Sequence, residues 1–494
     1  MKFLIDYLCI ISNMTSIYFK ILLYSFAAFI YAYFAGLSLL DDGLRHLAFA
    51  KNQDIMLSWG DVFPHSLFLT TYDPWFIWHK ILALYLQIFP FESVHIAINT
   101  TVLFSLMLLL DALIIKYANI KRTPLTIFVV LTIVLLVSAR YISLRPDLLS
   151  GLYLLLILLL NKNAMTIFFV TLLYSGSYYL FFLYSGSLAL SYLILKEYRT
   201  FNALLLGTLF GFIFHLYYGG SDFVRTVSYL LSDQSLREGL GVKEGLPLFG
   251  FLTIFNYYAL VVTIWSLAAL IIYKKYNYFK KQPLALLLLI MSPLWLAQVR
   301  YLELLLPLFV LFAFLESNTL LHTFFSRKIL YFIYKFIKTL KDVAYRKLFF
   351  FPALVYVVLM FGYLMKKYDH QEILLQKSYY KDQMFSNKTL LLNTLSNDLY
   401  YALYLNPTIK FIPSCSIGWF EDNREMKRLY IKMLSTHNTL SEEELSELME
   451  YTGASYYLHS PSNAKEIFSI VKLEKYHIKP LLIIDNKIIF EKER

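Results

Sequence analysis

The stretch SVHIAINTTVLFSLMLLLDALII, residues 93–115, decides the fold class, because its 23 residues hold one formally charged side chain, Asp111. An α-helix needs about 20 predominantly apolar residues to cross the ~30 Å hydrocarbon core of a bilayer. Of the 494 residues in the chain, 58% are hydrophobic and 16% are charged, whereas roughly 25% are charged in soluble domains. The sequence therefore predicts a mainly α-helical membrane protein.

Ten further apolar runs resemble this one, which gives 11 candidate spans. Every backbone polar group in hydrocarbon needs an internal partner, so the shorter runs must be tilted, surrounded by protein or extended by polar turns. We expect a polytopic helical bundle over residues 1–365. The runs lie near 19–40, 93–115, 124–139, 147–160, 164–174, 178–195, 201–216, 249–273, 283–297, 302–320 and 348–365.

Lysine and arginine are distributed unevenly over the predicted loops. With a cytoplasmic N-terminus and an uncleaved first span, the inside loops hold 17 Lys and Arg in 53 residues, and the outside loops hold 9 in 97. This bias satisfies the positive-inside rule. The two largest outside loops are then 41–90 and 217–248, the basic stretch 321–347 is inside, and residues 366–494 are extracytoplasmic. We expect an integral, multi-pass protein of a bacterial inner or plasma membrane.

The net charge of +11 does not indicate nucleic-acid binding. Residues 366–494 hold 17 basic and 17 acidic residues, so the whole excess belongs to the hydrophobic part of the chain. Cys9 and Cys415 stand at opposite ends of the chain, and we therefore expect neither a disulfide framework nor a thiolate metal site.

The polar tail, 366–494, is predicted to be a small extracytoplasmic α/β domain. Apolar, strand-like pieces alternate in it with helical ones. The sequence Ser-Glu-Glu-Glu at 441–444 predicts a capping box at a helix start. The strand-like pieces are 390–393, 456–459, 480–484 and 487–490.

Adjacent carboxylates open the first outside loop, where DDGLRH, residues 41–46, follows the first span. Such groups at a membrane surface are costly unless they are solvated, paired or used. One interpretation is a polar helix end, with an Asp capping the next helix. The other is a general base or metal ligand that faces a lipid-borne substrate. His46, four residues after Asp42 on the expected helix, would share its face and could orient a carboxylate or bind a metal.

The loop continues with MLSWGDVFPH at 56–65 and YDPWFIWHK at 72–80. The order of acidic pair, Arg with a ring residue, apolar helix, Gly-Asp-x-x-Pro and proline-started aromatic helix resembles the first external loop of GT-C fold glycosyltransferases. It is most similar to the branch of aminoarabinose lipid A transferases and protein O-mannosyltransferases. The loop of that branch runs Asp-Glu, Arg-Tyr, Gly-Asp-Trp-x-x-Pro and Lys-Pro-Pro-Leu.

The resemblance implies roles by position. Asp41 matches the catalytic Asp, Arg45 and His46 match the Arg-Tyr pair, and residues 60–61 match the Gly-Asp pair. A GT-C-like bundle would then transfer a sugar from a polyprenyl-phosphate donor to a hydroxyl acceptor, with inversion at the anomeric carbon.

Two positions depart from the branch. Asp42 stands where the branch has Glu, and Asp73 stands where it has a phosphate-facing Lys. Either other cations hold the phosphate, or Asp73 serves a metal or the acceptor. The Asp73-Pro74 pair is also a common start of a helix.

The chemistry of sugar transfer requires a carboxylate base for the acceptor hydroxyl and cations for the departing phosphate. Arginine offers a planar fork of donors that suits phosphate oxygens. Arg140 and Arg145 lie in one short outside loop, Arg300 lies in another, and Arg45 follows the acidic pair. Snorkelling at helix ends is the alternative role of these arginines.

The predicted substrate ligands are ring and carboxylate side chains of the first outside loop: His46, Asp73, Trp75 and His79. No cofactor is required by the sequence. A divalent cation remains open, because Asp41, Asp42 and Asp73 would offer an oxygen-rich site.

The sequence thus predicts an enzyme, a glycosyltransferase dependent on a polyprenyl-phosphate sugar, with a lipid, glycan or protein acceptor. Two other interpretations stay open. An O-antigen ligase or polymerase type of glycan-transfer protein also has about a dozen spans, although its large loop usually lies between late spans. A lipid-linked sugar transporter would need charges along a central path, and Asp111 is the obvious charge deep in an apolar run.

Overall fold

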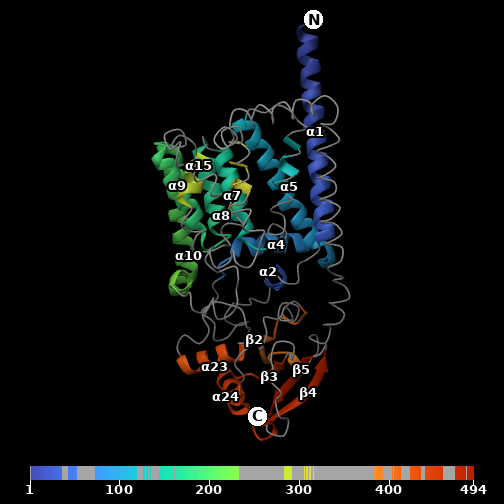
Figure 1. The fold of residues 1–494 in the computed structure, drawn as a ribbon, viewed down its shortest axis with the longest axis vertical. Coiled ribbons are helices and arrows are strands. Elements are labelled where there is room, and N and C mark those ends of the chain that lie inside the picture. The colour runs from blue at the N-terminus through green and yellow to red at the C-terminus, as the bar shows by residue number, and fades with distance from the viewer. Residues whose placement is uncertain are drawn as a thin grey trace, which may run out of the picture.

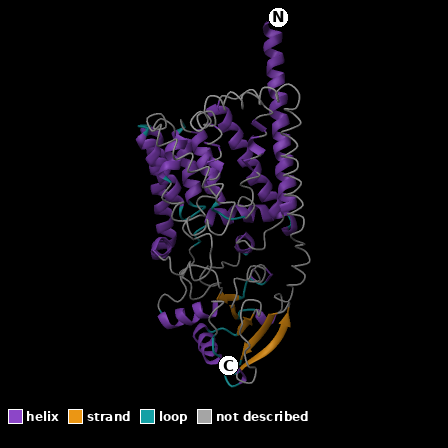
Figure 2. Cartoon of the chain, viewed as in Figure 1, coloured by secondary structure: helices purple, strands orange, loops and turns teal. Residues whose placement is uncertain are grey.

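The computed structural model describes the chain in segments, and helices dominate them (Figures 1 and 2). The prediction of a mainly α-helical chain is confirmed over this part. The segments are 2–35, 43–52, 73–118, 144–160, 163–232, 283–291, 383–392, 405–412, 423–434, 440–459, 473–484, 487–493, residue 403, and short pieces within 126–134 and 305–315.

The helices of the first 300 residues form an upright bundle, with the N-terminus projecting from one end (Figure 1). The shorter helix α4 lies across the other end of the bundle, beside α2. The helices are α1 (Lys2–Ala35), α2 (Gly43–Lys51), α4 (Phe76–Ile88), α5 (Phe91–Ala118), α7 (Leu148–Leu160), α8 (Ala164–Ser175), α9 (Phe181–Ile194), α10 (Tyr198–Ser232) and α15 (Pro283–Ile290).

Two described helical segments are long and apolar enough to cross a membrane, Ser93–Tyr117 in α5 and Tyr198–Arg225 in α10. Other apolar helices are shorter. For example, α7 has 13 residues, which at 1.5 Å per residue extend about 20 Å. Most of its side chains are buried against other helices, as the sequence predicts for a short run. The shorter apolar segments are Ile17–Tyr33, Phe76–Ile88, Leu148–Leu160, Ala164–Ser175 and Phe181–Ile194.

The remaining predicted runs cannot be compared in full. The runs 249–273 and 348–365 lie outside the described residues, and the runs 19–40, 124–139, 283–297 and 302–320 lie partly outside them. The boundary expected between 365 and 366 also lies outside them.

Helix α10 differs from the predicted pattern, in which an outside loop begins at 217. The helix continues to Ser232, with a kink at Gly220, whose φ is 48° and ψ −125°. Glycine takes this backbone conformation without the Cβ penalty of other residues, so the chain turns there and re-enters a helix. The first part of the predicted loop 217–248 is therefore helical.

Small residues allow α10 to approach α8 closely. A Cβ atom added at Gly211 would lie 2.5 Å from the Cβ of Ser175, and one added at Gly207 would lie 2.7 Å from the Cβ of Thr171. Such contacts do not occur between real side chains, so the two helices can pack at this distance only with glycine at both positions.

A buried ion pair joins α1 to α5. The Lys20 ammonium donates to both carboxylate oxygens of Asp111, at 2.9 and 3.0 Å, and the Tyr24 hydroxyl donates to one of them at 3.1 Å. The carboxylate that sequence analysis identified inside an apolar run thus has its counter-ion 91 residues away. This arrangement satisfies both charges and holds the two helices together.

Two contacts join the ends of described helices. Lys116 donates to the carbonyl oxygens of Leu158 and Leu159, at 2.8 and 3.0 Å, so the ends of α5 and α7 meet. The Ile77 amide donates to the Gly176 carbonyl at 2.9 Å, so the start of α4 meets the turn between α8 and α9.

The last 110 residues contain a five-stranded sheet of order β2-β1-β3-β5-β4. β1 pairs in parallel with β2 and β3, and β5 pairs antiparallel with β3 and β4. We call the sheet and its helices the C-terminal unit. Its elements are β1 (Thr389–Leu392), β2 (Lys410–Ile412), α23 (Arg424–Leu434), α24 (Glu442–Thr452), β3 (Tyr456–His459), β4 (Ile478–Ile484), β5 (Lys487–Lys492) and the short 3₁₀ helix η4 (Gln383–Phe385).

The four predicted strand pieces are confirmed as β1, β3, β4 and β5. The capping box is also confirmed. The Ser441 hydroxyl accepts from the Glu444 amide at 3.2 Å, and the Glu444 carboxylate accepts from the Ser441 amide at 2.8 Å. Figure 1 shows the C-terminal unit beyond the bundle end that holds α2 and α4.

Candidate functional site

The structure joins three of the predicted site residues in one hydrogen-bonded chain, which we call the Asp73–His79–His46 relay. His79 Nδ1 lies 2.7 Å from Asp73 Oδ2, and His79 Nε2 lies 2.8 Å from His46 Nδ1. The chain links α2, which carries His46, to α4, which carries His79.

The local sequence explains the Asp73 end of the relay. Asp73 Oδ1 accepts the backbone N–H of Trp75 at 2.9 Å, just before α4 begins. Asp is favoured in such a turn because its side-chain oxygen accepts a backbone N–H two residues further on. His79 stands one turn into α4, where its ring reaches back to the other carboxylate oxygen. The Asp73-Pro74 pair therefore forms the turn before α4 instead of its first residues, since the N-cap position belongs to Trp75.

The relay runs from a partly exposed end to a buried one. The Asp73 side chain is 29% exposed, and the His79 side chain is 1% exposed. His46 is also 1% exposed. Aromatic rings enclose the imidazoles, since Phe49 stacks on His79 at 5.7 Å between centroids and Trp75 meets His46 edge-on at 5.0 Å.

The carboxylate fixes the direction of the hydrogen bonds. An ionised Asp73 only accepts, so His79 Nδ1 holds a proton, and the neutral His79 ring must accept at Nε2. His46 Nδ1 then donates to His79, and the accepting nitrogen of a neutral His46 ring is Nε2. A proton taken up there can move from His46 Nδ1 to His79 Nε2, where the resulting imidazolium lies against the Asp73 carboxylate.

Two further loops meet the start of α4. The Trp78 indole donates to the Leu144 carbonyl at 3.1 Å. Leu144 is fully buried and has a φ of 54°, an uncommon left-handed conformation for a leucine. This contact holds the chain just before Arg145 and Pro146 against α4.

The third loop is the turn after α8. Gly176 accepts from the Ile77 amide, and Trp75 packs edge-on against Tyr179 at 5.8 Å between centroids. Nearby, His215 of α10 lies 2.7 Å through Nε2 from the Ser175 carbonyl oxygen. Segments from four parts of the sequence thus surround the relay.

The predicted site residues have different outcomes. His46, Asp73, Trp75 and His79 are brought together. Trp75 is only 5% exposed and packs between rings, so its ring is part of the wall around the relay. Arg145 lies in the loop that Trp78 holds, and the backbone of Arg45 lies in α2. The positions outside the described residues are Asp41, Asp42, Arg140 and Arg300.

Sequence reasoning missed the residues that position the relay. Trp78 was not among the predicted substrate ligands, and its indole holds the loop before Arg145. Phe49 and His215 had no local signal, because their contacts join residues far apart in the sequence.

The described residues contain no group of three or more His, Cys, Asp or Glu side chains disposed to hold a metal ion. In the relay, ring nitrogens face each other or the carboxylate, so the three side chains are hydrogen-bonded in series instead of converging on one point. Asp41 and Asp42, which the sequence suggests as further oxygen ligands, lie outside the described part.

No protein-family model matches the sequence, and no curated protein matches it significantly.

Proposed function

We propose that the protein is a membrane glycosyltransferase of GT-C type, which moves a sugar from a polyprenyl-phosphate donor to a hydroxyl acceptor with inversion. The observation that carries the proposal is the Asp73–His79–His46 relay. The relay is built from the predicted loop whose motifs resemble those enzymes. Its residue nearest the acidic pair in the sequence is His46, four positions after Asp42.

The finer architecture belongs to the same proposal. The chain would have about 11 spans, a cytoplasmic N-terminus and the C-terminal unit outside, in a bacterial inner or plasma membrane. Support comes from the two long apolar helices, and from the position of α2 and α4 at the end of the bundle nearest the C-terminal unit.

The proposed chemistry assigns the base to Asp41, with Asp42 beside it. Asp41 takes the proton of the acceptor hydroxyl as the oxygen attacks the anomeric carbon, and the bond to the donor phosphate breaks on the opposite side. The relay then receives that proton at His46 Nε2 and passes it toward Asp73, which is the end with access to water. The relay therefore returns Asp41 to its basic form after each transfer.

The departing phosphate needs cations. Arg145 supports this role best, because the Trp78 hydrogen bond to Leu144 fixes the loop that precedes it. Arg45, Arg140 and Arg300 are proposed as further phosphate ligands. A divalent cation held by Asp41, Asp42 and Asp73 is the alternative source of positive charge.

The test is to incubate the purified protein in nanodiscs with polyprenyl-phosphate sugars and to measure free polyprenyl phosphate by mass spectrometry. Release in step with glycosylated acceptor is expected. Transport of the intact lipid without release would replace the proposal with a transporter, and transfer of a preassembled glycan alone would favour a ligase.

Two His79 variants test the relay separately from its structural role. Gln keeps hydrogen-bonding atoms at this place but cannot carry a proton, whereas Ala loses both properties. We expect His79→Gln to fold like the wild type. It should lower kcat by about 10²-fold or more, with little change in KM. Full activity of His79→Gln together with loss in His79→Ala would assign the relay a structural role only.

A further inference from the structure

Helix α23 of the C-terminal unit has two chemically different faces. Its buried side consists of apolar and aromatic side chains, Met426, Leu429, Tyr430 and Met433. The opposite side presents Arg424, Lys427, Arg428 and Lys432, whose spacing of three and four residues places them along one stripe of the helix.

The basic stripe lines a groove of about 480 Å³. Among the described residues, four cations and one aliphatic residue, Ile431, form its wall, and none of these is a carboxylate. We call it the α23 groove. This lining favours an anion that is attached to an apolar body.

Two neighbouring carboxylates position the cations. Glu425 accepts from Arg428 at 2.6 Å, and Glu444 of α24 accepts from Lys432 at 2.6 Å. The hydrogen bond from Arg428 lowers the pKa of Glu425 below its ordinary range. The Arg428 side chain nevertheless remains 58% exposed, so part of its guanidinium fork still faces water. Positive charge exceeds negative charge along the groove.

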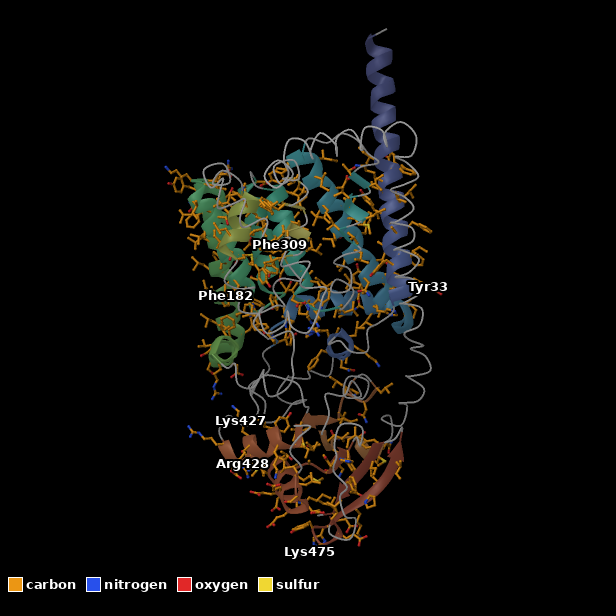
Figure 3. All side chains as sticks on the ribbon, in the orientation of Figure 1. Tyr33, Phe182, Phe309, Lys427, Arg428 and Lys475 are labelled. Atoms are coloured by element: carbon orange, nitrogen blue, oxygen red, sulfur yellow. The ribbon has the colours of Figure 1, made fainter. Side chains whose placement is uncertain are left out.

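The position of α23 indicates what reaches the groove. Figure 1 shows α23 along the side of the C-terminal unit nearest the helical bundle, and Figure 3 shows Lys427 and Arg428 extending from α23 away from the strands. If the bundle lies in a membrane, this side of the unit is next to the headgroups of one leaflet.

We propose that the α23 groove binds the phosphate headgroups of anionic lipids in the membrane that holds the bundle, and that this contact docks the C-terminal unit on the bilayer. Charge complementarity carries the proposal, because a lipid phosphate fits the Arg and Lys donors and Ile431 meets the apolar part of the lipid. The inference requires the membrane location but not sugar transfer, so it can fail or succeed independently of the proposed enzyme activity.

The test compares the full-length protein in nanodiscs of phosphatidylcholine with the protein in nanodiscs that also contain phosphatidylglycerol. Hydrogen exchange of the α23 amides reports docking. Since one Lys or Arg near an anionic surface contributes about fivefold in affinity, we expect the anionic lipid to slow exchange by about fivefold or more. Lys427→Gln combined with Arg428→Gln should bring the ratio between the two nanodiscs close to one.

Lys475→Gln is the matched control. It also removes an exposed cation of the C-terminal unit, but one that lies at the end away from the bundle (Figure 3). The control should keep the full effect of anionic lipid. The proposal is overturned if α23 exchanges equally in both nanodiscs, if Lys475→Gln removes the effect as well, or if inorganic phosphate gives the same protection without anionic lipid.

Discussion

Replacement of Asp73 by Asn should reverse the hydrogen bonds of the relay while leaving the fold intact. The carboxylate now accepts from the Trp75 amide at 2.9 Å and from His79 Nδ1 at 2.7 Å. An amide has one accepting oxygen and one donating nitrogen, so it can satisfy the Trp75 N–H only by turning its NH₂ toward His79. His79 must then accept at Nδ1 and donate from Nε2 to His46, which must hold its own proton at Nε2.

The magnitude follows from the two ways of placing the amide. The arrangement above keeps both hydrogen bonds, whereas the flipped amide sets two donors against each other and leaves a backbone N–H unpaired, at a cost of about 1–3 kcal/mol. The reversed chain is thus favoured by roughly 5- to 150-fold, and His46 Nε2 loses its basic form. We expect the rate of proton-limited transfer to fall by about 10²- to 10⁴-fold. Stability should change by less than about 1 kcal/mol, because the Asn side-chain oxygen can still accept the Trp75 N–H in the turn before α4.

Two assays follow this change. Single-turnover kinetics with a polyprenyl-phosphate sugar measure the rate, and ¹⁵N NMR of labelled histidine reports which ring nitrogens of His79 and His46 are protonated. Asp73→Ala serves as the comparison, since it should lose the rate and also about 0.5–1.5 kcal/mol of stability with the hydrogen bond to the Trp75 amide. Wild-type transfer by a folded Asp73→Asn protein with reversed tautomers would refute the relay mechanism.

Other parts of the molecule give further predictions. Asp111→Asn should destabilise the bundle by about 3–5 kcal/mol in thermal unfolding, because it leaves the buried Lys20 ammonium without its carboxylate. Lys20→Met combined with Asp111→Leu should recover most of the loss. Equal stability of the single and double variants would contradict this prediction. Gly211→Ala should cost about 1–3 kcal/mol through overpacking against α8, while Gly186→Ala, with nothing within 4 Å of its Cβ, should be neutral in the same melts. The pKa of Glu444 is lowered in the fold because partial burial, which alone raises it, is outweighed by hydrogen bonds from an α23 ammonium and from the backbone at the start of α24. The ionised Glu444 carboxylate therefore stabilises the fold above its unfolded-state pKa, and this stabilisation is lost as pH falls through its folded-state pKa. The difference in α24 hydrogen exchange between wild type and Glu444→Gln should accordingly vanish in acid and should not grow there.

The sequence predicts elements whose signal is local. The apolar runs predict helices such as α5 and α7, the Ser-Glu-Glu-Glu motif predicts the start of α24, and short apolar pieces between helical ones predict four of the strands. β2 was missed because three residues, Lys410–Ile412, are too few for a pattern. The extension of α10 was missed because Tyr-Tyr-Gly-Gly at 217–220 is typical of a turn, and only the positive φ of Gly220 shows that a helix resumes after it.

The sequence singles out the three residues of the relay, but not the contacts between them. The Asp73-Pro74 pair predicts a helix start nearby, whereas α4 begins at Phe76 and places His79 one turn later. That the ring of His79 also reaches His46, 33 residues away, depends on how α2 packs against α4. The same holds for Lys20 and Asp111, since each charge can be read from the sequence but their pairing is a product of tertiary packing.

The most direct test of sugar transfer is the single-turnover release of polyprenyl phosphate by Asp41→Asn in nanodiscs, compared with wild type and with the exposed control Glu474→Gln of the C-terminal unit. We expect release and an inverted anomeric product from wild type and Glu474→Gln, and a loss of at least about 10²-fold in Asp41→Asn with unchanged thermal stability. Wild-type release by Asp41→Asn, or no release by any of the three folded proteins, would contradict this expectation.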